Sequence, residues 1–253
     1  WDAEQLNNQE LVLRYTFAYY EEGFPGEVKM TVKYSLTNDN ELVIDYRGTT
    51  NKKTVVNMTS HGFFSLTGIG TPTPSQLDTI LTINADFYIP IDENSIPTGE
   101  IRPVEGTPFD FRQSKAIGRD IAADDDQIKI GRGYDHNFCL NEGDGPAATA
   151  YDPESGRMLE VFTDLCGVQL YTGNFIDGTE TGKGGIVLNQ HYGFCLETQF
   201  YPDTPNQPNF PQCTFKAGEK FSSIVGVRGD WFYNHGFKAS PRVTLKYMPV
   251  DEI

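Results

Sequence analysis

The sequence has few cysteines, no cluster of basic residues and no long apolar run, and each shortage excludes a class of protein. Its four cysteines, Cys139, Cys166, Cys195 and Cys213, stand far apart with no CxxC pair. This pattern favours buried free thiols over a zinc site made from cysteines. The formal net charge of -15 argues against a nucleic-acid or anionic-membrane partner. No apolar run approaches the length that spans a bilayer.

The first five residues have neither a basic stretch nor an apolar core, which is not typical of a signal peptide. Together with the dispersed thiols, this favours a reduced, cytoplasmic location.

Several catalytic motifs are absent as well. There is no HxH or HExxH spacing for a metal, no GxSxG for acyl transfer, and no P-loop or GxGxxG for a nucleotide. We therefore expect neither a metal nor a nucleotide cofactor. What remains is a set of histidines, carboxylates and amides, such as Gln169 and Asn174. With aromatic rings nearby, these groups suit a polyhydroxylated ligand such as a sugar.

Short strands separated by glycine- and proline-rich turns fill the chain. Residues 27–36 alternate between apolar and polar side chains, and a turn at 38–40 leads to a hairpin partner at 41–46. No segment predicts a long amphipathic helix. We expect an all-β sandwich or barrel in one domain, with residues 86–106 as a turn-rich connection. Further strands are expected at residues 11–17, 54–59, 79–85, 147–151, 158–163, 167–172 and 221–227.

Residues 192–199 are the most informative of these strand-like stretches. Period-two alternation places Cys195, Glu197 and Gln199 on one face. A carboxylate among apolar neighbours is costly to ionise, so we expect the pKa of Glu197 to be raised toward the range useful for proton transfer. Four prolines in residues 202–211 predict a rigid loop beside it. The alternative is that Glu197 faces solvent from an edge strand.

Three histidines stand beside strand-like segments: His61, His136 and His191. A lone histidine near aromatic residues is more often packed for structure than catalytic. The residues alone therefore leave open which of the three takes part in chemistry.

Taken in order, several stretches resemble the aldose 1-epimerases, also called galactose mutarotases. The resemblance covers about residues 1–226, and no single stretch carries it. The matching stretches are residues 22–26, 56–68, 84–86, 97–101, 106–111, 134–138 and 167–175, followed by the Glu197 strand with its proline-rich loop.

The resemblance implies a large twisted antiparallel β-sandwich, the galactose mutarotase-like supersandwich. It implies the cofactor-free interconversion of α and β anomers of free aldoses such as galactose and glucose, by a monomer or weak dimer. Glu197 occupies the place of the family's general base, and His61 that of its general acid. Asp135 and Gln169 match family positions that bind sugar hydroxyls and line the pocket.

Two departures from the family pattern stand out. The family carries an Arg and a second His in Asn-Arg and His-Gly-Gly motifs upstream of the position of Trp1, and neither motif occurs here. Either the chain is a fragment or the protein lacks these groups. The family usually ends soon after the strand at 221–227, whereas this chain continues to residue 253. We expect residues 227–253 to be an extension, with 243–247 packing on a sheet edge.

Two other functions remain as alternatives. A non-catalytic sugar-binding or regulatory protein of the same fold would bind galactose or glucose without anomerisation. A lyase or hydrolase acting on polysaccharide could use a similar sandwich, but it would need an extended cleft, and the matched motifs argue against it.

Overall fold

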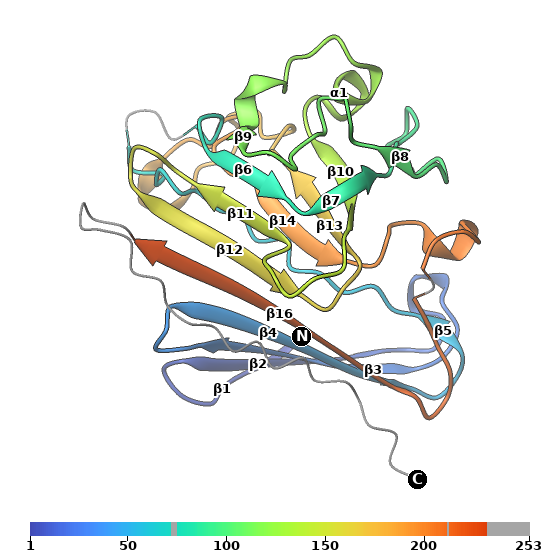
Figure 1. Cartoon of the computed structure of the whole chain (residues 1–253). Helices are drawn as coiled ribbons and strands as arrows, with labels where there is room; N and C mark the ends of the chain where they lie inside the picture. Colours follow the sequence, from blue (N-terminus) through green and yellow to red (C-terminus); the bar gives the residue numbers. More distant parts are fainter. Residues whose placement is uncertain (72–74, 212, 232–253) are drawn as a thin grey trace.

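The computed structural model describes residues 1–71, 75–211 and 213–231. It consists of antiparallel β-sheets, of which the largest has nine strands in the order β1-β2-β3-β4-β16-β12-β11-β6-β9 (Figure 1). The strands of this sheet are β1 (Asp2–Gln5), β2 (Glu10–Phe17), β3 (Val28–Leu36), β4 (Glu41–Thr50), β16 (Lys220–Trp231), β12 (Arg157–Thr163), β11 (Ala148–Tyr151), β6 (Ile80–Ile83) and β9 (Lys115–Ala116).

A second sheet of five strands has the order β14-β13-β10-β7-β8, so that β14 is an edge strand. A third pairs β15 with β5. In the described residues, no helix is long and apolar enough to cross a membrane. The remaining elements are β14 (Cys195–Gln199), β13 (Gly167–Tyr171), β10 (Asp135–Leu140), β7 (Ala85–Tyr88), β8 (Arg102–Pro103), β15 (Thr214–Phe215), β5 (Thr54–Val55), α1 (Asp126–Gly131) and the 3-10 turns Glu21–Gly23, Ile117–Arg119, Lys183–Gly185 and Thr204–Asn206.

One apolar core is shared by the two large sheets. Alternation along β3 buries Val28, Met30 and Val32 from the nine-stranded sheet. Val168 and Leu170 of β13 join the same cluster from the five-stranded sheet. Burying each such side chain stabilises the fold by about 1.5–3 kcal/mol. The expected all-β antiparallel sandwich is confirmed.

The chain passes from one large sheet to the other at Asn84. The strand expected at 79–85 is therefore divided, with β6 in the nine-stranded sheet and β7 in the five-stranded one. The connection expected at 86–106 contains most of β7 and all of β8. Periodicity alone cannot locate such a crossing, because both halves of the run are apolar strands.

The other differences concern the extent of strands. The strand expected at 54–59 ends at Val55, and the strands expected at 41–46 and 221–227 extend to Thr50 and Trp231. The proposed packing of residues 243–247 lies outside the described residues, as does most of the expected extension. The elements that were not predicted include the strands β1, β9, β10 and β15 and the short helix α1.

Candidate active site

The face of the five-stranded sheet that points away from the shared core is polar. Leu170 of β13 and Leu196 of β14 belong to the core, so the alternate residues point to the opposite side. The register sets Glu197 opposite Gln169. This face, called the polar face below, carries Asp135, Asn137, Gln169, Tyr171, Cys195, Glu197 and Gln199.

An irregular segment, residues 57–64, runs antiparallel to β14 along its free edge. At one end, the Asn57 side-chain amide donates to the Phe200 carbonyl at 3.0 Å and accepts from its N–H at 2.9 Å. At the other end, the backbones of Phe64 and Phe194 exchange hydrogen bonds of 2.8 and 3.0 Å. These two pairs cover the sheet edge and hold His61, which lies between them, over the polar face.

Glycine at position 193 permits the close approach of this segment. A Cβ atom there would lie 3.1 Å from a ring carbon of Phe63 and 3.2 Å from its Cβ. Contacts this short are tighter than ordinary van der Waals packing. The small residue before β14 therefore helps to set how near His61 comes to the strand.

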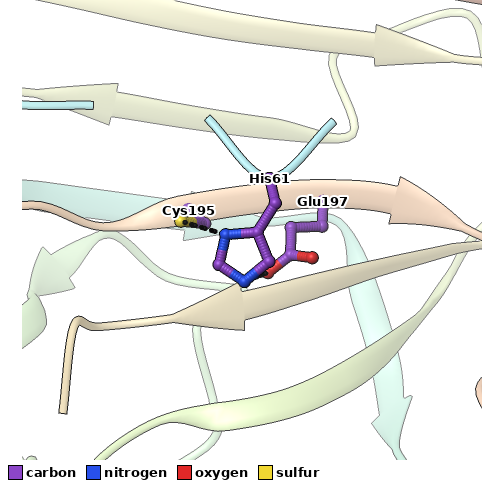
Figure 2. A group of neighbouring side chains, drawn as sticks. All are labelled: His61, Cys195 and Glu197. Atoms are coloured by element: carbon purple, nitrogen blue, oxygen red, sulfur yellow. Dashed lines mark hydrogen bonds and ion pairs between the residues drawn. The ribbon is translucent and has the colours of Figure 1, made fainter. Parts of the chain in front are cut away.

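The His61 imidazole lies between two side chains of β14, as Figure 2 shows. Its Nε2 is 3.4 Å from Oε1 of Glu197, and its Nδ1 is 3.5 Å from Sγ of Cys195. The Glu197 side chain is only 9% exposed, whereas that of His61 is 56% exposed. The Glu197 side chain is thus buried, and the alternative that it faces solvent is wrong, although β14 is an edge strand.

Burial and the charge of Asp135 together raise the pKa of Glu197 to about 7, against the lowering influence of His61. Burial likewise raises the pKa of Asp135, while the Gln169 amide and His61 act in the opposite direction. Burial also raises the pKa of the Cys195 thiol, which keeps its proton near neutrality. The site therefore combines a carboxylate that titrates near neutral pH with an accessible imidazole.

Amides of the polar face form a hydrogen-bonded network that includes Asp135. Gln169 Nε2 donates to Oδ1 of Asp135 at 2.8 Å. Gln199 Nε2 lies 3.4 Å from Oε1 of Gln169 and 3.3 Å from Oδ1 of Asn137. The network orients polar groups from three strands toward one place, as recognition of several hydroxyls requires.

Aromatic rings border these groups. Tyr171 contacts the His61 ring and Phe63, with ring centroids 5.7 and 5.8 Å apart. On its other side, Tyr171 stacks on Phe175, which is half exposed and lines an open hollow of about 690 Å³. Arg132 lies over the Phe175 ring, 5.3 Å from its centroid. Apolar faces therefore stand beside the polar face, an arrangement that suits a sugar ring.

The other two histidines have structural surroundings. His136 is fully buried, and its Nε2 lies 3.2 Å from Oε1 of Gln127 while its Nδ1 accepts from the Asp135 N–H. Burial lowers its pKa to about 3, so it stays neutral. The Nδ1 of His191 donates to the Thr172 carbonyl at 2.8 Å.

The Asn174 side chain likewise has a structural role. Its amide donates to the carbonyls of Gly131 and Tyr134, and its oxygen accepts from Thr172. Two residues of the polar face, Asn137 and Tyr171, were not singled out from sequence. Period-two spacing from Asp135 and Gln169 was the available signal.

Comparisons with known proteins point to one family. A family model described as aldose 1-epimerase matches residues 1–228. The chain is 48% identical over 214 residues to the galactose mutarotase of Rattus norvegicus, covering 84% of this chain and 59% of the relative. It is 39% identical over 230 residues to the aldose 1-epimerase of Escherichia coli (strain K12), covering 89% and 65%.

Solved structures have the same architecture. The galactose 1-epimerase of Lactobacillus acidophilus superposes with a TM-score of 0.79 at 31% identity, covering 91% of this chain and 66% of that one. An aldose epimerase homologue from C. elegans gives 0.82 at 22% identity, covering 92% and 69%, which is a likeness of fold. The chain thus spans about 59% of the length of the first curated relatives.

Proposed function

The chain belongs to the aldose 1-epimerase family, and on that premise we propose that it interconverts the α and β anomers of a free aldose, galactose or glucose. The observation that carries the proposal is the contact between Glu197, a buried carboxylate with a pKa of about 7, and the exposed imidazole of His61. An acid and a base side by side on a face lined with amides and rings suit proton exchange on a small sugar.

In the proposed mechanism, Glu197 takes the proton of the C1 hydroxyl while a protonated His61 donates a proton to the ring oxygen. The C1–O5 bond opens to give the free aldehyde and the C5 hydroxyl. Rotation about C1–C2 presents the other face of the carbonyl. Reclosure reverses both transfers, so Glu197 and His61 regain their starting states without a covalent intermediate.

The contact between the two groups must loosen when the sugar enters. Their atoms are 3.4 Å apart, and each must reach a different oxygen on C1, so the imidazole has to turn away from the carboxylate. The exposed position of His61 in the irregular 57–64 segment permits this rotation. Catalytic hydrogen bonds are often formed only in the substrate complex.

The remaining hydroxyls would be held by Asp135 and Gln169. These two side chains form one hydrogen-bonded unit at 2.8 Å, and each retains an unused oxygen or N–H toward the polar face. Tyr171, which lies opposite Asp135 in the strand register, offers an aromatic ring nearby.

Polarimetry on freshly dissolved α-D-galactose tests the proposal. We expect the chain to accelerate the approach to the equilibrium rotation, and Glu197→Gln to remove most of the acceleration, on the order of a 100-fold loss or more for a missing general base. Glu154→Gln, at an exposed turn, is the matched control and should retain full activity. An unchanged rate in folded Glu197→Gln would contradict the proposed base. Saturable galactose binding without acceleration would instead identify a binding protein.

A further inference from the structure

His61, Cys195 and Glu197 also have the composition of a metal site. Among the described residues, one ligand atom from each lies within 4.8 Å of the other two. The donors are an imidazole nitrogen, a sulfur and a carboxylate oxygen, which are the three kinds that Zn²⁺ binds in proteins.

The distance between two of these donors fits zinc closely. Zn–S bonds of about 2.3 Å and Zn–N bonds of about 2.0–2.1 Å, at a tetrahedral angle, place sulfur and nitrogen about 3.5 Å apart. The separation of Sγ of Cys195 from Nδ1 of His61 is 3.5 Å. The Glu197 carboxylate faces the other ring nitrogen, Nε2, at 3.4 Å. A Glu197 carboxylate oxygen lies within 4.8 Å of the His61 and Cys195 donor atoms, so turning the side chain away from Nε2 would bring it toward a cation bound at Nδ1.

We propose that these three side chains form an inhibitory site for a thiophilic divalent cation of the Zn²⁺ or Cd²⁺ type. Cys195 and His61 Nδ1 supply the first two ligands, Glu197 the third, and solvent completes the coordination from the exposed side of His61. The formal charge of -15 favours the approach of cations in general.

Binding exchanges a proton for a cation and changes no oxidation state. The S–H bond of Cys195 breaks, its proton passes to solvent, and a sulfur–metal bond forms from the thiolate electron pair. A nearby dication compensates for the burial that disfavours the thiolate. An occupied site holds both His61 and Glu197, so it would block anomerisation. That last consequence rests on the proposed function, whereas the binding itself does not.

Cd²⁺ titration followed by ultraviolet absorption tests the site directly, because a cadmium–thiolate bond gives a charge-transfer band. We expect one equivalent of Cd²⁺ to produce the band and Zn²⁺ to displace it. Cys195→Ser should abolish the band and weaken Cd²⁺ binding by about 100-fold or more, since even outer-shell changes cost about 10–100-fold. Cys166→Ser, which removes a partly exposed thiol elsewhere, is the matched control and should leave both unchanged.

A second variant keeps the test decisive if Cys195→Ser does not fold. His61 is exposed on an irregular segment, so His61→Gln should fold, and it should weaken Cd²⁺ binding while the thiol remains. No band in the wild type at millimolar Cd²⁺, or a band that persists in folded Cys195→Ser, would overturn the site. Binding unaffected by His61→Gln would also do so. Because the band does not depend on turnover, an inactive chain that binds Cd²⁺ would leave the metal site standing and contradict only the proposed epimerase activity.

Discussion

At the scale of single residues, opposing influences set how tightly Glu197 holds its proton. Burial raises its pKa, His61 lowers it, and Asp135 raises it again, for a value of about 7. A base must be ionised to accept a proton, so its environment sets the pH range in which the site can act.

We predict that kcat/KM falls as pH decreases through about 7, because Glu197 becomes protonated. Asp135→Asn should move the acidic limb to lower pH, since it removes a charge that raises the Glu197 pKa. Polarimetric rates between pH 5 and 9 measure this, and a flat profile would exclude Glu197 as the base.

The same burial costs stability when the carboxylate ionises. The folded-state pKa of about 7 lies above the ordinary glutamate value of 4.5, so the folded state binds the proton more tightly and stability decreases as pH rises from about 4.5 through 7. We predict that Glu197→Gln is more stable than the wild type at pH 8, by on the order of 2–3 kcal/mol, with the difference vanishing below pH 4.5. Urea unfolding at pH 4 and pH 8 measures it. Equal stability at pH 8 would contradict the raised pKa.

At the level of elements, the position of His61 depends on the segment 57–64 along the edge of β14. Asn57 holds one end through two hydrogen bonds to the Phe200 backbone, which a strand residue would make with its own main chain. A side-chain amide thus takes the place of a main-chain pair here, two residues after β5 ends at Val55.

We predict that Asn57→Ala releases this end of the segment and lowers kcat as well as stability. Two lost hydrogen bonds cost about 1–3 kcal/mol, but misplacement of the acid by about 1 Å can cost about 100-fold in rate. Asn51→Ala, which removes a side-chain bond to the Glu27 N–H far from His61, is the comparison variant. Parallel kinetic and denaturation measurements separate the two effects, and an unchanged kcat in Asn57→Ala would show that the segment does not position His61.

For the whole molecule, the shared core makes the two large sheets dependent on each other. We propose that the described residues form one folding unit, as the all-β pattern predicts. Leu170→Ala in the five-stranded sheet and Leu159→Ala in the nine-stranded sheet remove buried side chains of the same cluster. Each should cost about 2–5 kcal/mol and shift one common transition. Calorimetry showing two transitions, each shifted by only one variant, would contradict a single unit.

The sequence by itself determined which residues share a strand face, because side-chain direction alternates with a period of two wherever a strand forms. It thus placed Cys195, Glu197 and Gln199 together, and the family resemblance added His61, Asp135 and Gln169. Spacing along the chain carried no sign of a site that joins His61 to Cys195, since 134 positions separate them. Only the tertiary structure brought them into contact, because strand pairing and the bonds at Asn57 and Phe64 fix which distant segments lie side by side.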